Sequence, residues 1–140
     1  MTDTEFKKYR INNDTIDSQH YQLFNILQSI INCYHGVYDK KVITALMNEF
    51  LKLTESHFKY EKELMDLSFY NVHCVTDYEE HILEHRYTIS EIKSFLLRQK
   101  VKFPEEFPVE VISKILVDHI LGYDKKFVDW LNLHKNAFDL

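Results

Sequence analysis

The sequence contains few of the residues that break helices. Only two Gly and two Pro occur among its 140 residues. An all-β fold needs many tight turns, and Gly and Pro supply most of them, so their scarcity argues against such a fold. Long helices are expected instead. The length fits one domain, large enough to bury about two-thirds of its unfolded surface.

Cysteine is equally scarce, with Cys33 and Cys74 alone. Two cysteines are too few for a disulfide framework, and a chain of this length needs none in order to fold. We expect two reduced, partly buried thiols in a cytoplasmic protein. The polar, acidic start of the chain does not resemble a signal peptide.

Long apolar runs and blocks of one charge are also missing. No apolar run approaches the roughly 18 residues of a membrane span. The formal net charge is −5, from 17 basic and 22 acidic residues, and no cluster of Lys or Arg stands out. Such a chain has nothing to attract nucleic acid or an anionic membrane, so we expect neither as a partner.

Four segments carry apolar residues at helical spacing. They cover about 18–38, 40–65, 77–98 and 106–134. The links at 38–41, 66–76 and 99–105 are short, and short links between helices of similar length favour antiparallel neighbours. We therefore expect an all-α, up-down-up-down four-helix bundle. Residues 1–15 fit no pattern and are expected to form an N-terminal arm of this single domain, 1–140.

Histidine is the residue present in unusual number, with eight copies. His57 and Glu61, like His81 and His85, are four residues apart, and such pairs share one helix face. One pair alone is weak evidence for a site. The stronger signal is that each predicted helix offers a candidate ligand. The predicted metal ligands are His20, His57, Glu61, His81, His85, His119 and Asp124.

The ligand types narrow the choice of metal. Five histidines and two carboxylates are too many for one ion, and a structural zinc site prefers about four ligands that usually include Cys. Bridging carboxylates indicate two metals close together. Two octahedral ions have about twelve positions, of which these side chains and one oxygen bridge fill about eleven. The open position suits one small molecule and leaves little room for an organic substrate.

A ferritin-like di-iron site is the main structural alternative. Those bundles use Glu-x-x-His on two helices. The residues three positions before the candidate histidines of the last three helices are not Glu; they are Thr54, Tyr78, Ile82 and Leu116. Oxidase chemistry of that type is therefore disfavoured.

One ligand spacing does not fit an ideal helix. His119 and Asp124 are five residues apart, so their side chains diverge by roughly 140° at 3.6 residues per turn. A wider turn brings both onto one face, and such π-type bulges often occur at functional sites. We predict a π-like distortion between these two residues, eased by Gly122.

The pattern resembles the hemerythrin family, and more closely its single-domain bacterial members. The matching motifs are Ile16-Asp17-x-Gln19-His20-x-x-Leu23-Phe24, His57-Phe58-x-x-Glu61-x-x-x-Met65, His81-x-x-x-His85 and His119-Ile120-x-x-x-Asp124. Myohemerythrin is an up-down-up-down bundle. The chain departs from the family at Ile115, where many relatives carry Trp.

The resemblance implies a role for each ligand. His81, His85 and His119 would hold one iron, which is coordinatively full. His20 and His57 would hold the other, which keeps the open position, and Glu61 and Asp124 would bridge the two non-haem irons beside an oxo or hydroxo group. Leu116 and Ile120 would line the oxygen pocket.

The function implied by the resemblance is reversible oxygen binding for transport or storage, without enzymatic activity. Three alternatives stay open at this point: an oxygen or redox sensor acting through a separate, unidentified protein partner, a di-iron enzyme such as a peroxidase or nitric oxide-handling protein, and metal storage. His35, His73 and His134 are expected on the surface or in loops, with a His73–Cys74 accessory metal or redox site as a minor possibility. We expect one or two of four tyrosines to form hydrogen bonds to the metal-ligating side chains; these are Tyr60, Tyr78, Tyr87 and Tyr123.

Overall fold

The structure is a computed structural model that describes residues 2–36, 39–101 and 109–138. Every regular element in these ranges is helical. The long elements are α2 (Asp14–His35), α3 (Lys40–Leu67), α5 (Val75–Val101), α6 (Val109–His119) and α7 (Lys125–Phe138); the short ones are α1 (Asp3–Phe6), the 3₁₀ turn η1 (Lys7–Tyr9), α4 (Tyr70–His73) and the π-helical segment η2 (Ile120–Asp124).

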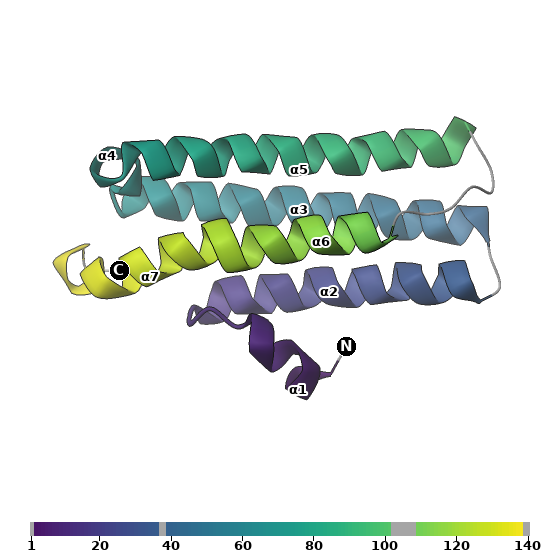
Figure 1. Cartoon of the computed structure of the whole chain (residues 1–140), viewed down its shortest axis with the longest axis horizontal. Helices are drawn as coiled ribbons and strands as arrows, with labels where there is room; N and C mark the ends of the chain where they lie inside the picture. Colours follow the sequence, from purple (N-terminus) through teal and green to yellow (C-terminus); the bar gives the residue numbers. More distant parts are fainter. Residues whose placement is uncertain (1, 37–38, 102–108, 139–140) are drawn as a thin grey trace.

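The long helices lie side by side as a bundle (Figure 1), with α6, η2 and α7 joined into one continuous rod. Their inward faces form a single apolar core, whose fully buried members include Ile16, Leu23, Met47, Phe50 and Phe127. The predicted all-helical bundle is confirmed at this level. Within the described ranges, no helix has both the length and the apolar character needed to cross a membrane.

Two helices begin with side-chain caps. The Asn13 side chain accepts a hydrogen bond from the Ile16 backbone N–H at 3.0 Å, so α2 begins at Asp14 rather than near Ser18. Asp39 caps α3 in the same way. Asn and Asp are preferred caps because they satisfy backbone donors that have no partner within the helix. The apolar stripe locates each helix, but the cap decides its first residue.

The link expected at 66–76 is partly wrong, because it contains α4 and the start of α5. Phe69 turns the chain with a left-handed backbone, φ 61° and ψ 22°. Tyr70 then packs against Phe127 and Trp130 of α7, with ring centroids 4.9 and 5.1 Å away. These tertiary contacts stabilise a helical turn that local sequence does not indicate. The predicted ends at residues 38 and 106 lie outside the described residues.

The N-terminal arm is folded against α2. Phe6 and Ile11 are buried, and the Phe6 ring meets the rings of Tyr21 and Phe24 at 5.2 and 5.7 Å. The Ile11 N–H donates to the Asp17 carboxylate at 2.9 Å. The arm therefore covers the start of α2, the segment that leads into His20.

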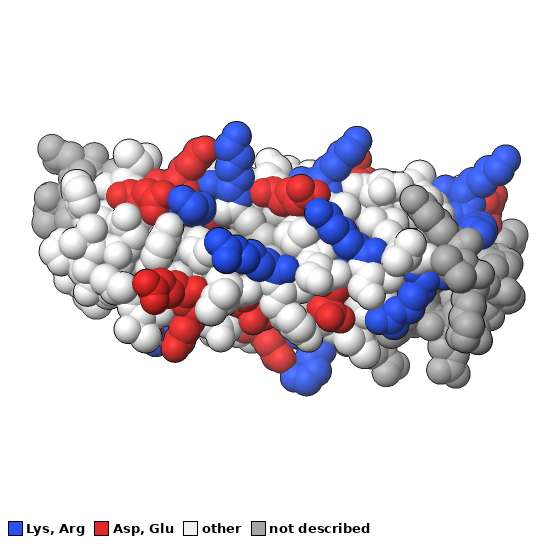
Figure 2. All heavy atoms as spheres, turned by 90° about the horizontal axis from the view of Figure 1, so that it is seen from above, with Lys and Arg blue, Asp and Glu red and all other residues white. Residues whose placement is uncertain are grey.

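Charged side chains are interspersed over the outside of the bundle. Figure 2 shows basic and acidic residues mixed across one face, without a broad region of one sign. Several of them pair across short distances, such as Lys126 of α7 with Asp77 of α5 at 2.8 Å. Exposed pairs of this kind contribute little to stability, so the fold rests mainly on its apolar core.

The segment η2 confirms the predicted distortion between His119 and Asp124. It is π-helical over Ile120–Asp124, and the Lys125 N–H is directed at the Ile120 carbonyl, five residues earlier. The extra residue in this turn brings Asp124 to the same side as His119. Gly122 lies at the centre of the segment, is exposed, and has no neighbour within 4 Å of the position a Cβ would take.

Because nothing approaches that position, Gly122→Ala is expected to stabilise the protein by up to about 1 kcal/mol, the difference in helix propensity between the two residues. Chemical denaturation of the variant beside the wild type measures the change. A clear loss of stability would show that the π-helical backbone itself requires glycine.

Candidate metal centre

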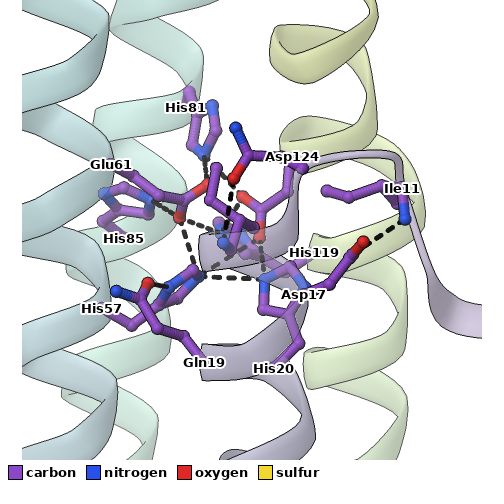
Figure 3. Close-up of polar contacts among 12 residues, drawn as sticks. Ile11, Asp17, Gln19, His20, His57, Glu61, His81, His85, His119 and Asp124 are labelled. Atoms are coloured by element: carbon purple, nitrogen blue, oxygen red, sulfur yellow. Dashed lines mark hydrogen bonds and ion pairs between the residues drawn. The ribbon is translucent and has the colours of Figure 1, made fainter.

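All seven predicted ligands meet in one buried cluster at the middle of the bundle (Figure 3). None is more than 6% exposed. They come from every long rod: His20 from α2; His57 and Glu61 from α3; His81 and His85 from α5; His119 from the end of α6; and Asp124 from the end of η2. Sequence reasoning thus identified the whole cluster, although its role in binding metal stays a prediction.

Asp124 lies between two sets of histidines. Its Oδ1 is 2.8 Å from His81 Nε2 and 2.9 Å from His119 Nε2. Its Oδ2 is 2.8 Å from His20 Nε2 and 3.5 Å from His57 Nε2. Each carboxylate oxygen therefore faces a different pair of imidazoles, which is the arrangement a carboxylate needs to bridge two cations.

Glu61 lies on the opposite side of the same cluster. Its Oε1 is 3.0 Å from His57 Nε2 and 3.3 Å from His85 Nε2. Its Oε2 is nearest to His81 Nε2, at 3.9 Å. Glu61 is thus close to histidines of both sets, but its two oxygens are not divided between them as clearly as those of Asp124.

The ligand atoms separate into two groups, each with all its members within 4.8 Å of one another. One contains Glu61, His81, His85, His119 and Asp124, and the other contains His20, His57 and Asp124. The division matches the expected three-histidine and two-histidine halves, with Asp124 common to both. A buried His/Glu/Asp cluster of this kind is compatible with a di-iron site.

Several of these atoms are buried without a hydrogen bond. Both oxygens of Glu61, and the Nε2 atoms of His85 and His119, have no hydrogen-bond partner despite their close neighbours. A buried polar atom without a partner costs free energy. Imidazole nitrogens and carboxylate oxygens that converge on common points are the donor set that a cation satisfies once bound protons have left. The residues present therefore fit a metal centre.

The environment keeps both carboxylates ionised. Burial raises the pKa of Glu61, as does the Asp124 charge, but the charge of His57 and the nearby imidazole groups of His119 and His57 hold its pKa well below the usual range. Burial likewise raises the pKa of Asp124, and this is outweighed mainly by His119, together with His20 and His57. Two negative ligands are thus available at neutral pH.

The histidines differ among themselves. Burial lowers the pKa of His57 and His119, but the neighbouring Glu61 and Asp124 outweigh it and raise these pKa values to about 9 and about 10. Burial dominates at His85 and lowers its pKa to about 4. The His85 ring also stacks flat on Phe58, 3.9 Å between centroids. In the metal-free protein, protons on His57 and His119 therefore neutralise the carboxylate charge.

The residues expected around the ligands have mixed outcomes. Leu116 and Ile120 are buried on either side of His119 in sequence; their lining of an oxygen pocket stays a prediction. His35, His73 and His134 are exposed, as expected. The metal-ligand groups found among the described residues include neither His73 nor Cys74. Cys33 and Cys74 are half-buried free thiols.

The expected tyrosine hydrogen bonds are replaced by a different partner. In the described part of the chain, the Nδ1 atoms of His20, His81 and His119 are buried without a hydrogen bond, and Tyr123 only packs against the His81 and His119 rings. Gln19 instead accepts a hydrogen bond from His57 Nδ1–H at 2.5 Å. Sequence reasoning missed this role because the contact joins two helices, and no spacing rule reaches across them.

Comparison with curated proteins finds a relative that matches along most of the chain. The chain is 27% identical to a bacteriohemerythrin of Stenotrophomonas maltophilia (strain R551-3) over 128 residues, which cover 89% of this chain and 78% of the relative. This similarity confirms the resemblance to the hemerythrin family that the motifs predicted. No family model matches the chain. No solved structure matches it either.

Metal binding is expected to release protons. Histidine must be unprotonated to bind a metal, and the raised pKa values of His57 and His119 leave both protonated near neutral pH. Anaerobic addition of ferrous ion at pH 7 should release about two protons from these side chains, beyond any released by bound water. Calorimetry in buffers of different ionisation enthalpy measures the number. An enthalpy independent of the buffer would contradict the protonated cluster.

Proposed function

From the similarity to a bacteriohemerythrin, we propose that this protein binds dioxygen reversibly at a non-haem di-iron centre, as an oxygen carrier or store. The observation that carries the proposal is the pair of buried ligand groups that share Asp124. One carboxylate in contact with both histidine sets indicates two metal ions rather than one. The relative is named a bacteriohemerythrin, and the resemblance to that family supports iron as the metal.

Each half of the cluster has its own role in the proposal. His81, His85 and His119 would hold one iron with three imidazoles. His20 and His57 would hold the other with two, which would leave it a free position. Asp124 and Glu61 would be the carboxylates shared between the irons, beside an oxo or hydroxo group. The distances from Asp124 Oδ1 and Oδ2 to the two sets support this assignment.

The iron pair, when bound, supplies the electrons that make oxygen binding reversible. The protein's own contribution is to orient the ligands and to exclude water. Leu116 and Ile120 are 3% and 0% exposed on either side of His119 in sequence. Such side chains beside the free position would keep it dry and slow the irreversible oxidation of the irons.

A small ligand fits the room that the cluster leaves. Five imidazoles and two carboxylates would occupy most of the coordination positions of two octahedral ions. One diatomic molecule is then accommodated more readily than an organic substrate, which supports a binding role without enzymatic activity.

The chain order of the bundle is also part of this proposal. We take the successive long rods to run up, down, up and down, which the alternating direction of the colours along the rods in Figure 1 supports. In this order the early parts of α2 and α5 lie at the same depth as the later part of α3, so that each helix can supply ligands to one cluster.

Oxygen uptake tests the proposal directly. Protein reconstituted anaerobically with ferrous ion should bind two irons per chain and then take up one dioxygen per two irons. A visible absorption band should appear on exposure to oxygen and disappear when the solution is flushed with inert gas. One zinc per chain in place of iron, or an oxidation that inert gas does not reverse, would contradict the carrier or storage function.

Ligand replacement tests the assignment of the cluster. His119→Ala removes one ligand of the three-histidine half and is expected to lose iron from that half. The exposed His35, at the end of α2, offers a matched control, since His35→Ala makes the same change outside the cluster and should keep both irons. Metal analysis after gel filtration measures the difference. Two irons retained by His119→Ala would refute its role.

A further inference from the structure

A polar cavity of about 490 Å³ lies between α2 and α3 and reaches one ligand of the cluster. Its walls are Asp14, Thr15, Ser18, Gln19, Gln22, Leu53, Ser56 and His57. Six of these eight residues carry oxygen or nitrogen groups outside the metal cluster, so the cavity is suited to water. His57 forms its inner boundary: one side of the ring faces the cavity and the other faces the metal ligands.

Gln19 occupies the point where the cavity meets the ring of His57. Its Oε1 is 2.5 Å from His57 Nδ1 (Figure 3). The opposite nitrogen, Nε2, is 3.0 Å from both His20 Nε2 and Glu61 Oε1, within the cluster. An amide oxygen can only accept, so Nδ1 carries the hydrogen and Nε2 is directed at the metal position.

Both residues belong to the half of the cluster that has fewer histidines. Gln19 directly precedes His20 on α2, and His57 is the only other histidine of that group. The same turn of α2 therefore supplies one ligand and orients the next one from α3. The buried Nδ1 atoms of His20, His81 and His119 have no such partner.

We propose that Gln19 is a positioning residue: it fixes the ring orientation and tautomer of His57 and separates the less-coordinated half of the metal centre from the water of the polar cavity. Without an acceptor at position 19, His57 Nδ1–H would donate its hydrogen bond to cavity water instead. The ring could then rotate, and water could reach the metal side. This proposal depends on the proposed function only in the measurement of iron retention, because that measurement requires bound iron.

Three variants separate this role from a general effect of cavity polarity. Gln19→Leu removes the acceptor with little change of size. Gln19→Glu restores an acceptor at the same place. Gln22→Leu makes the same chemical change three residues further along α2, in the wall of the same cavity but away from the cluster. Gln19→Ala removes the acceptor without adding bulk. If the Leu side chain disturbs folding, the same two measurements are made on Gln19→Ala, and the same results are expected.

The first measurement needs no iron. In the metal-free protein, proton NMR should show a low-field His57 Nδ1–H signal that exchanges slowly with water in the wild type, in Gln19→Glu and in Gln22→Leu. In Gln19→Leu the signal should broaden or disappear, because only cavity water remains as acceptor. A merely structural role of Gln19 would leave this exchange rate unchanged in a folded variant.

The second measurement follows iron retention under anaerobic conditions. Losing the hydrogen-bond partner of a ligating histidine typically weakens metal binding by about 10–100-fold. A chelator should therefore remove one of the two irons faster by about that factor from Gln19→Leu, while Gln19→Glu and Gln22→Leu stay near the wild-type rate.

Equal exchange and equal iron loss in Gln19→Leu and Gln22→Leu would overturn the proposal. Failure of oxygen binding alone would contradict only the proposed function, since neither measurement uses oxygen.

Discussion

Two carboxylates, Glu61 and Asp124, are held ionised in the middle of an apolar bundle, and the rest of the site is arranged around that constraint. A buried carboxylate is costly unless positive charge and hydrogen bonds compensate it. Here five imidazoles surround the pair, with Nε2 atoms 2.8 to 3.9 Å from the carboxylate oxygens. In the metal-free state, protons on His57 and His119 carry the compensating charge. A pair of cations can take the place of those protons, because a metal binds the same imidazole nitrogens once they are unprotonated.

The same cluster explains why the bundle tolerates an irregular helix. A regular α-helix would turn Asp124 away from His119, and Asp124 is the residue common to both ligand groups. The π-helical turn over Ile120–Asp124 corrects the direction of that single side chain. An irregular turn in the core is sustained when the contacts that it creates outweigh its cost. The close approaches of Asp124 to His20, His81 and His119 are those contacts.

The two histidine sets of the cluster differ in the contacts that orient their rings. His85 is oriented by apolar stacking on Phe58 and lies in the three-histidine half. His57 is oriented by a hydrogen bond to Gln19 and lies in the two-histidine half, beside a polar cavity. Phe58 and His85 also line a cavity of their own, between α3 and α5. The two halves therefore differ in the contact that orients a histidine, which is aromatic stacking in one and a hydrogen bond in the other.

The sequence by itself determined the helical class, the members of the candidate cluster and the need for a distortion after His119. These depend on local rules: apolar residues at 3.6-residue spacing, side chains four apart on one face, and a spacing of five that no regular helix accommodates. The start of α2 at Asp14, the helical turn at Tyr70 and the Gln19–His57 hydrogen bond were established only by the structure. Each depends on a cap or on a contact between segments distant in sequence. The residue spacing within one helix does not predict which residues of another segment it will contact. Which oxygen of Asp124 meets which histidines is of the same kind, since it is fixed by how three separate helices pack around one carboxylate.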